Sequence, residues 1–305
     1  MRILITGGAG YIGTELTYEL AKLDNVEEIV IYDNFSRANY NLFIGKDKLP
    51  TKKIRFVDGE LLDSRKLRKN LENIDVVYHL AARVITPFAD QNPHLFEQIN
   101  HWGTAELVYA VEKREIKKFI YMSSVSVYGS GNEEVDVDSP VNPKTFYGIS
   151  KMRGEEHVKR LFQKQPTFII RCGNVYGYSK SMRFDAVINR FMFDANFKNK
   201  ITVNGNGNQY RSFIHIKKVT SALTNILHSD IKSNKFDLVD KTINVNDIVE
   251  VLHEIYPDLE MLFVNQHLSL KNLKVKSNPT MNQLITVDNF SLKEELQEFK
   301  KEFSF

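Results

Sequence analysis

Two side chains that could move a proton are four residues apart in the segment Tyr147-Gly-Ile-Ser-Lys151. Residues at this spacing share one face of an α-helix, so the phenol and the ammonium would be neighbours. The pKa of a free tyrosine is about 10, and the side chain acts as a base at neutral pH only where positive charge stabilises its phenolate. Because the Lys151 ammonium can supply such charge, the segment predicts a catalytic tyrosine at position 147.

The same spacing of tyrosine and lysine occurs three more times, so the surrounding sequence has to select among the pairs. The others are Tyr18/Lys22, Tyr109/Lys113 and Tyr176/Lys180. The first would cover a packed helix face, the second lies near the end of a long helix, and the third is in a glycine-flanked loop. Ligands of parallel sheets bind outside the carboxyl ends of the strands. Only Tyr147 begins a helix soon after a strand that ends in hydroxyls, Ser123-Ser124, which favours it.

A serine at the end of that strand would complete the acid–base group. The Ser124 hydroxyl could hydrogen-bond a substrate oxygen and orient its proton toward Tyr147. Ser123 and Ser126 are alternatives, because successive strand residues face opposite sides and a shift of one residue changes the choice.

The segment Thr6-Gly-Gly-Ala-Gly-Tyr-Ile-Gly13 connects a predicted strand over residues 2–6 to a helical pattern that begins at Tyr11. Glycine is needed in such a turn where φ is positive and where backbone must approach a phosphate closely. The free N–H groups and the positive end of the helix dipole then attract the anion. This strand–turn–helix pattern predicts a site for the pyrophosphate of a dinucleotide.

Asp33 ends the next apolar run, about twenty residues after the glycines, as expected in a dinucleotide-binding fold. A carboxylate at this position accepts hydrogen bonds from the adenosine ribose and repels a 2′-phosphate, which favours NAD over NADP. Arg37, four residues later, would weaken that preference. Oxidised nicotinamide would add its positive charge to that of Lys151 beside the tyrosine.

Composition excludes several other classes of protein. The chain has 305 residues and a formal net charge of +3, from 41 basic and 38 acidic side chains, which is too even for a nucleic-acid surface. No apolar run is long enough to span a bilayer. Because the first residues already read as a strand, we expect no signal peptide. Cys172 is the single cysteine and cannot form an internal disulfide. His79 has no second ligand at zinc spacing, so no metal site is expected. We expect a cytoplasmic protein with no nucleic-acid or membrane partner.

Strand-length apolar runs alternate with helical stretches in the first half of the chain. Strands are expected at 2–6, 28–32, 54–58, 74–80, 117–123 and 167–171, and helices at 11–23, 63–72, 91–114 and 145–164. This alternation predicts an α/β fold with a doubly wound parallel sheet of the Rossmann type.

The alternation ends near Cys172, which predicts two parts. Residues 1–172 would form the NAD-binding Rossmann domain, and residues 173–305 a smaller α/β substrate lobe with some segments returning to the main domain. In the second part we expect helices near 183–198 and 217–228, and short strands near 201–204 and 212–216.

The ordered motifs resemble those of the extended short-chain dehydrogenases/reductases, in the NAD-dependent nucleotide-sugar epimerase/dehydratase group, with a pattern like that of the UDP-glucose 4-epimerases. The resemblance covers about two thirds of the chain. Its segments are Thr6-Gly-Gly-Ala-Gly-Tyr-Ile-Gly13, Asp33-Asn-Phe-Ser36, Gly59-Glu-Leu-Leu-Asp63, His79-Leu-Ala-Ala82, Asn100 with Gly103-Thr104, Ser123-Ser-Val-Ser-Val-Tyr-Gly129, Tyr147-Gly-Ile-Ser-Lys151, Arg171-Cys-Gly-Asn-Val-Tyr-Gly177 and Gly205-Asn-Gly-Asn-Gln-Tyr-Arg-Ser-Phe-Ile-His215.

This resemblance implies roles for individual residues. The catalytic residues would be Ser124, Tyr147 and Lys151. The cofactor would be bound by Gly7, Gly10, Tyr11, Ile12, Gly13, Asp33, Asn34, Ser36, Glu60, Leu61, Leu80, Ala81, Ala82, Asn100, Tyr147 and Lys151. Glu60 and Leu61 would contact the adenine, and Asn100 would be a buried support. The substrate would be bound by Ser124, Asn174, Arg183 and Arg211. Asn174 would touch the nucleotide diphosphate and Arg211 would grip it.

The sequence departs from the group's pattern in two places. Relatives that dehydrate the sugar carry an Asp-Glu pair directly after the catalytic hydroxyl, whereas this chain has Val125-Ser126. That difference argues against a 4,6-dehydratase. No arginine follows Arg211, although the group often has a second diphosphate arginine near its C-terminus. Arg211 would then act alone or with Arg183 or a lysine. Arg211 could also be an ordinary surface ion-pair partner, but its fork of donors suits phosphate.

We therefore expect an NAD-dependent nucleotide-sugar epimerase that acts at C4 through a 4-keto intermediate. The alternative with the same site is a one-way nucleotide-sugar 4-dehydrogenase or 4-ketoreductase with net NAD(P)H turnover. A more distant alternative is a non-catalytic nucleotide-sensing protein on the same fold. By analogy with the group, we expect a homodimer formed through the helices at 91–114 and 145–164.

Overall fold

A seven-stranded sheet forms the centre of the larger part of the molecule. The computed structural model describes residues 1–45, 47–84, 92–264 and 272–305. The strands are β1 (Arg2–Thr6), β2 (Glu28–Asp33), β3 (Ile54–Asp58), β4 (Val76–His79), β5 (Lys118–Ser124), β7 (Thr167–Cys172) and β11 (Asn234–Leu238). Their order is β11-β7-β5-β4-β1-β2-β3, and every neighbouring pair is parallel. The order reverses between β1 and β4, which is the position where such sheets bind ligands.

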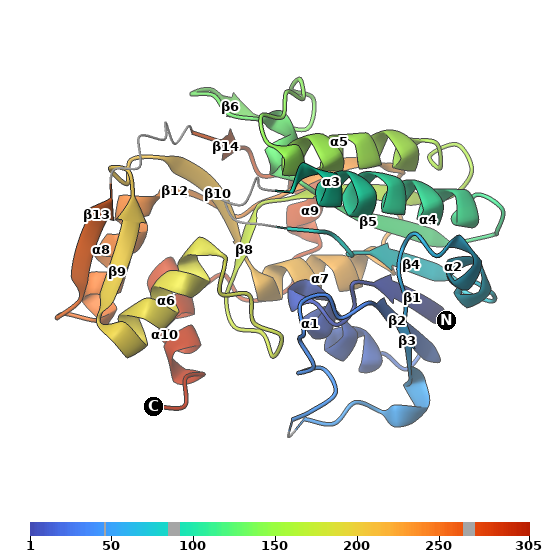
Figure 1. Ribbon diagram of the computed structural model, residues 1–305, viewed down its shortest axis with the longest axis horizontal. Coiled ribbons are helices and arrows are strands. Elements are labelled where there is room, and N and C mark those ends of the chain that lie inside the picture. The colour runs from blue at the N-terminus through green and yellow to red at the C-terminus, as the bar shows by residue number, and fades with distance from the viewer. Residues whose placement is uncertain (46, 85–91, 265–271) are drawn as a thin grey trace.

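Helices cover both faces of this sheet (Figure 1). On β1, Ile3 and Ile5 pack with α1 (Tyr11–Ala21) and α7 (Ile216–Ile226), whereas Leu4 points into the opposite core. That second core is shared with α2 (Ser64–Asn70), α4 (Gly103–Val111) and α5 (Phe146–Lys159). A strand buried on both faces needs apolar residues at successive positions, as β1 has. The predicted doubly wound α/β class is confirmed.

The sequence predicts a helix over 91–114, of which residue 91 lies outside the described residues; the described part is built from three shorter segments. They are α3 (Pro93–Phe96), a π-helical stretch at Glu97–Trp102 and α4. The wider turn buries Asn100 completely. Local widening of this kind is frequent at functional sites and leaves no clear mark on hydrophobic periodicity.

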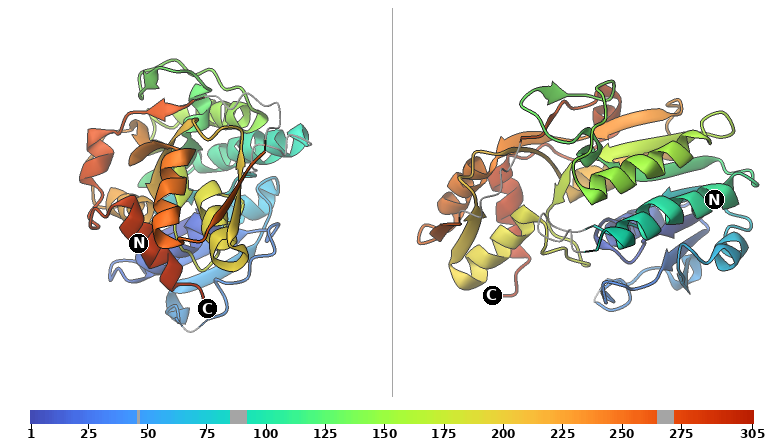
Figure 2. Two further views of the ribbon diagram at one scale, coloured as in Figure 1. Left: turned by 90° about the vertical axis from the view of Figure 1, so that its left-hand side faces the viewer. Right: turned by 45° about the horizontal axis from the view of Figure 1, so that its top comes forward.

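Among the described residues, the smaller part of the molecule contains two short sheets and three helices. It lies beside the carboxyl ends of the main strands (Figures 1 and 2). One sheet has the order β12 (Lys241–Asn244), β10 (Tyr210–His215), β8 (Asn174–Tyr176), and the other pairs β13 (Glu260–Val264) with β9 (Lys200–Asn204). The helices α6 (Val187–Lys198), α8 (Val245–Ile255) and α10 (Leu292–Lys301) share its apolar core.

Several C-terminal segments belong to the larger part. Strand β11 extends the main sheet beside β7, and α7 and α9 (Pro279–Gln283) pack in the core under β1. The strands β6 (Glu134–Val135) and β14 (Lys274–Val275) form a small pair of their own. A domain boundary at residue 172 stays a prediction. In the described part of the chain, no helix combines the length and apolarity required to traverse a bilayer.

Candidate functional site

The glycine turn after β1 brings three backbone segments into close contact. Gly7 has a φ of 72°, and a Cβ there would lie 2.6 Å from the Ala81 nitrogen. A Cβ on Gly13 would lie 2.3 Å from the Gly7 oxygen. No side chain fits at either distance, so this packing requires glycine. The turn leaves the N-terminus of α1 uncovered, which is the arrangement that binds a pyrophosphate.

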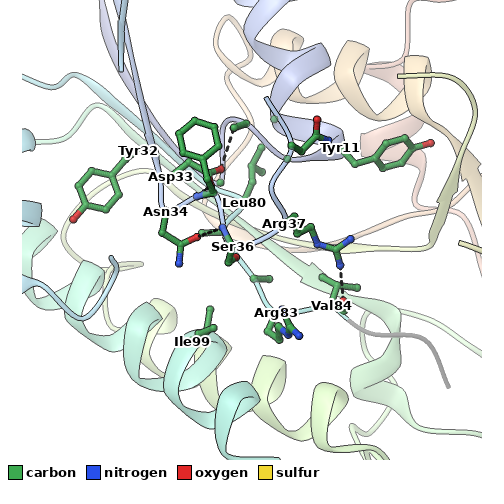
Figure 3. Close-up of a pocket in the computed structure, with 18 of the residues that line it drawn as sticks. Tyr11, Tyr32, Asp33, Asn34, Ser36, Arg37, Leu80, Arg83, Val84 and Ile99 are labelled. Atoms are coloured by element: carbon green, nitrogen blue, oxygen red, sulfur yellow. Dashed lines mark hydrogen bonds between the residues drawn. The ribbon is translucent and has the colours of Figure 1, made fainter. Parts of the chain in front are cut away.

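A crevice runs along the carboxyl ends of β1, β2 and β4 (Figure 3). Most of the predicted cofactor residues line it, namely Gly7, Gly10, Tyr11, Ile12, Gly13, Asp33, Asn34, Ser36, Glu60, Leu61, Leu80, Ala81 and Ala82. Arg183 lines it too, and the lining reaches Met122, two residues before Ser124. The structure thus gathers the predicted cofactor residues from the loops after β1, β2, β3 and β4 around one space.

At one end of the crevice, the backbone around Asp33 is held in a fixed turn. The Asp33 carboxylate accepts hydrogen bonds from Ala9 N at 3.0 Å and Phe35 N at 2.9 Å, while burial raises its pKa. Asn34 Nδ2 donates to both Glu60 carboxylate oxygens at 3.0 Å. The carboxylate is therefore oriented by the protein at the place where a ribose would be recognised.

Behind the crevice lies a buried chain of polar side chains. His79 bonds to Thr6 through Nδ1 at 2.7 Å and to Thr104 through Nε2 at 2.9 Å. The Thr104 hydroxyl donates to the Asn100 carbonyl at 2.6 Å, so it must accept from His79 Nε2–H. Burial lowers the pKa of His79 to about 3. His79 is thus a neutral, hydrogen-bonded part of the core.

Asn100 does not line the crevice, but it fixes a residue that does. Its Oδ1 accepts from Arg83 N at 2.7 Å, and its Nδ2 donates to Arg83 O at 3.0 Å. The same Nδ2 also lies 3.0 Å from Ser150 Oγ on α5. The buried amide therefore ties the loop after β4 to the helix that carries Tyr147 and Lys151, which agrees with a supporting role.

Ser124, Tyr147 and Lys151 come together at the end of β5. Ser124 Oγ lies 2.5 Å from Ser126 Oγ, and burial raises the pKa of Tyr147 while the Ser124 side chain opposes that rise. Lys151 is buried; its Nζ donates to the Met122 carbonyl at 2.7 Å and lies 4.9 Å from the centre of the Tyr121 ring. Thr145 caps the helix through a hydrogen bond from Gly148 N at 3.0 Å. This cap fixes where the first turn of α5 presents Tyr147.

Burial dominates the electrostatics of Tyr147 and Lys151. Burial raises the pKa of Tyr147, against the opposing effects of Ser124 and the Arg183 guanidinium. Burial also lowers the pKa of Lys151 to about 7. Desolvation disfavours the charged form of each group, and it outweighs the opposing effects of Ser124 and Arg183 on Tyr147 and of Glu155 on Lys151. Added positive charge near position 147 would therefore favour the phenolate.

Arg183 belongs to a loop that is bonded to residues in the first turns of α1. Thr14 Oγ1 donates to Ser181 Oγ at 2.7 Å, and Ser179 Oγ donates to the Tyr11 carbonyl at 3.0 Å. Arg183 Nε donates to Asp185 at 3.0 Å, and Arg37 Nη1 lies 3.6 Å from the same carboxylate oxygen. The loop thus places Arg183 on the wall of the crevice.

Asn174 and Arg211 lie on neighbouring strands of the small sheet. Asn174 is opposite Phe213, two residues after Arg211 on β10. Asn174 Nδ2 donates to the Ser212 carbonyl at 3.1 Å, and Arg211 Nη1 donates to the Tyr210 carbonyl at 2.9 Å. Burial lowers the pKa of Arg211. Neither residue lines the crevice, so the structure places them in a separate group on the smaller part of the molecule.

The alternatives weighed from sequence have other partners. Ser123 is buried and donates to Glu155 at 2.7 Å, whereas Ser126 stays beside Ser124. Of the other tyrosines, Tyr18 donates to the Asp47 carbonyl at 3.1 Å, and Tyr176 donates to Glu295. The Tyr109 ring packs against His157.

Other lining residues were not foreseen from sequence. Tyr32, Arg83, Ile99 and Met182 all face the crevice. The sequence indicates only the charge of Arg37. In the structure, its guanidinium donates to the Val84 carbonyl at 2.6 Å across the crevice (Figure 3). These positions depend on which loops meet in space, and no local pattern marks them. Gly59 begins the segment Gly59-Glu-Leu-Leu-Asp63, which the sequence analysis identified as one of the family's motifs. A Cβ at this position would lie 2.3 Å from the Tyr32 ring.

The sequence model of the NAD dependent epimerase/dehydratase family matches residues 3–239. The chain belongs to this family. A Methanocaldococcus jannaschii protein, provisionally named as a UDP-glucose 4-epimerase, is 32% identical over 262 residues, covering 83% of this chain and 82% of that protein. The human dTDP-D-glucose 4,6-dehydratase is 31% identical over 233 residues, covering 74% of this chain but only 65% of the dehydratase.

Solved structures share the fold over the whole chain. The UDP-glucuronic acid 4-epimerase of Bacillus cereus, in complex with UDP-glucuronic acid and NAD, has a TM-score of 0.84 and 24% identity, covering 99% of this chain and 98% of the other. The family match confirms the expected extended short-chain dehydrogenase/reductase family and NAD as its cofactor. The glycine contacts and the oriented Asp33 carboxylate fit that cofactor.

Proposed function

We propose that this family member is an NAD-dependent nucleotide-sugar epimerase that inverts C4 through a 4-keto intermediate. The observation that carries the proposal is the meeting of Ser124, Tyr147 and Lys151 at the end of β5, next to the crevice that fits NAD. Relatives with epimerase names, including the Methanocaldococcus protein, support it.

In this proposal Tyr147 takes the proton of the C4 hydroxyl and later returns it. Bound NAD supplies the hydride acceptor and, when oxidised, positive charge near the phenol. Lys151 stays anchored on the Met122 carbonyl and stabilises the phenolate, and Ser124 hydrogen-bonds the reacting oxygen. Asn174, Arg183 and Arg211 hold the diphosphate while the sugar turns to present its other face.

The residues after Ser124 favour epimerisation over dehydration, although relatives of about 30% identity include dehydratases. Val125 is buried, and Ser126 is engaged with Ser124. The sequence has no acidic residue between Ser124 and Glu133. A side chain able to protonate a leaving hydroxyl is thus missing where the dehydratase chemistry needs one.

The test compares Tyr147→Phe with Tyr18→Phe, a matched change in a pair of the same spacing. The wild-type protein should interconvert the C4 epimers of a sugar nucleotide, from a panel starting with UDP and dTDP sugars, without added oxidant. Tyr147→Phe should lose about 10²–10⁴-fold in kcat and still bind NAD, while Tyr18→Phe keeps its activity. Full activity in Tyr147→Phe would refute the base.

Absorbance at about 340 nm separates the alternatives, because an epimerase shows no net change in NADH whereas a dehydrogenase or ketoreductase does. A protein that binds sugar nucleotides and transfers no hydride would instead be a sensor.

We also propose a homodimer formed through α4 and α5. Trp102 and Phe146, which lie at the starts of these helices, are 53% and 43% exposed, and large exposed aromatic side chains often mark an interface. Sedimentation equilibrium should give twice the chain mass, and a monomer at micromolar concentration would contradict the proposal. A cytoplasmic location is proposed as well, since Cys172 is free and buried; cell fractionation tests it.

A further inference from the structure

A row of buried polar side chains crosses three strands of the main sheet directly beneath the predicted catalytic group. Ser123 on β5 is paired in register with Arg171 on β7, which is paired with Asp237 on β11. Glu155 on α5 covers the row. All four residues are at most 2% exposed, so their charges are removed from water. Such burial is costly unless each group is paired.

The Glu155 carboxylate is fully engaged by this row. It accepts hydrogen bonds from Ser123 Oγ at 2.7 Å and from Arg171 Nε and Nη2 at 2.9 and 2.8 Å. On its other side, Arg171 Nη1 donates to Tyr128 Oη at 3.0 Å, and Tyr128 Oη donates to the Asp237 carboxylate at 2.7 Å. Arg171 and Glu155 therefore form a bidentate ion pair with a fixed direction, and the negative partner, Glu155, lies on α5.

Stabilisation of the fold does not by itself explain why Glu155 and Arg171 form a buried ion pair. Buried ion pairs can often be replaced by apolar side chains of similar volume without loss of stability. The position of Glu155 offers another reason, because it lies one helical turn after Lys151 and thus on the same face of α5.

Lys151 needs a nearby anion. On its own helix, Tyr147 and Glu155 lie one turn before and one turn after Lys151. From β5, Lys151 contacts the Tyr121 ring and the Met122 carbonyl, and on β4 the nearby His79 is neutral. Burial lowers the pKa of the ammonium, and the Glu155 carboxylate acts against that loss. Arg171 binds the same carboxylate, and Tyr128 and Asp237 follow Arg171 along the row.

We propose that Glu155, oriented by Arg171, is a positioning residue that keeps the Lys151 ammonium charged and so sets the acid–base strength of Tyr147. The inference rests on the function proposed above for Lys151. Through Ser123, the same carboxylate also holds the residue that precedes Ser124.

The first test measures the charge of Lys151 directly. In protein with ¹³Cε-labelled lysine, the Lys151 NMR signal is identified by its loss in Lys151→Met and titrated with pH. Glu155→Gln keeps the shape of the side chain and removes its charge. The Lys151 midpoint should fall by about one pH unit or more, the size expected when a neighbouring opposite charge is removed.

The control is Glu295→Gln, which removes another buried carboxylate, bonded to Lys241 at 2.9 Å. Glu295 lies on α10 in the smaller part of the molecule, so the Lys151 midpoint should not move. A shift in this control equal to that in Glu155→Gln would overturn the inference, because it would reflect general destabilisation.

A double variant separates a positioning role from a structural one. Glu155→Gln leaves Arg171 buried without its counterion, so the single variant can fail to fold. Glu155→Gln with Arg171→Met removes both charges and should restore folding. If the pair serves stability alone, the folded double variant titrates Lys151 as the wild type does, and the inference is overturned. If Glu155 keeps Lys151 charged, the midpoint stays low.

Activity then provides an independent readout. The alkaline limb of the kcat/KM profile, where Lys151 loses its proton, should move to lower pH in Glu155→Gln and in the double variant but not in Glu295→Gln. An unmoved limb in an active Glu155 variant overturns the inference. If the wild type epimerises no sugar nucleotide, the proposed function fails, and the NMR titration still decides the role of Glu155.

Discussion

The buried histidine behind the crevice makes the stability of the protein depend on pH in a calculable way. His79 is fully buried, is held between Thr6 and Thr104, and has a pKa lowered by burial from 6.5 to about 3. Below pH 6.5 the unfolded chain binds a proton there that the native protein does not bind. The free energy of unfolding therefore falls as the pH falls from 6.5 toward 3.

The size of this effect follows from the pKa difference. At pH 5 the solution is 1.5 units below 6.5, and at about 1.4 kcal/mol per unit His79 lowers the free energy of unfolding by about 2 kcal/mol. His215, whose pKa is also lowered to about 3 by burial, contributes a similar loss that is independent of His79.

The measurement is urea unfolding of the wild type and of His79→Gln at about pH 7.5 and pH 5. Each protein is its own reference, so any constant cost of losing the imidazole cancels. The loss of stability between the two pH values should be smaller in His79→Gln by about 2 kcal/mol. His228 is exposed, so His228→Gln should behave like the wild type. An equal loss in His79→Gln and wild type would refute the neutral, buried state of His79.

Two further changes test the cofactor site. Gly13→Ala places a Cβ 2.3 Å from the Gly7 oxygen, so the turn must open and NAD affinity should fall by about 100-fold or more, measured by calorimetry; Gly131→Ala, with no atom within 4 Å, should bind NAD normally. Asn100→Leu removes both hydrogen bonds to the Arg83 backbone and should cost about 1–3 kcal/mol of unfolding free energy and raise the NAD Kd, whereas an unchanged Kd in the folded variant would show that the amide does not shape the crevice.

The sequence could predict those parts of the site that depend on one residue type or on residues a few positions apart. The glycines at 7 and 13 are required by contacts within one turn or with the adjacent strand loop, and the alternation of apolar runs reflects burial of β1 on both faces. The hydroxyls that end β5 and the Tyr147–Lys151 spacing belong to the same kind of local signal.

What sequence could not provide depends on contacts between distant segments. The loop that carries Arg183 is fastened to α1 by Thr14 and Ser181, which are 167 residues apart. The choice of Ser124 over Ser123 rests on Glu155, because a hydroxyl already donated to a buried carboxylate is not free for a substrate. Neither relation follows from periodicity or propensity, since each is fixed by how the helices pack on the sheet.

The electrostatics at the end of β5 would keep Tyr147 protonated until a cofactor is bound. Burial favours the neutral forms of both Tyr147 and Lys151, raising the pKa of the phenol and lowering that of the ammonium. A site balanced in this way gains acid–base strength only when further positive charge enters the crevice beside it. Proton abstraction would then be confined to molecules that hold an oxidised cofactor, so that removal of the hydroxyl proton and removal of hydride from the same carbon stay coupled. By keeping Lys151 charged, Glu155 would determine how much further positive charge is needed to ionise Tyr147.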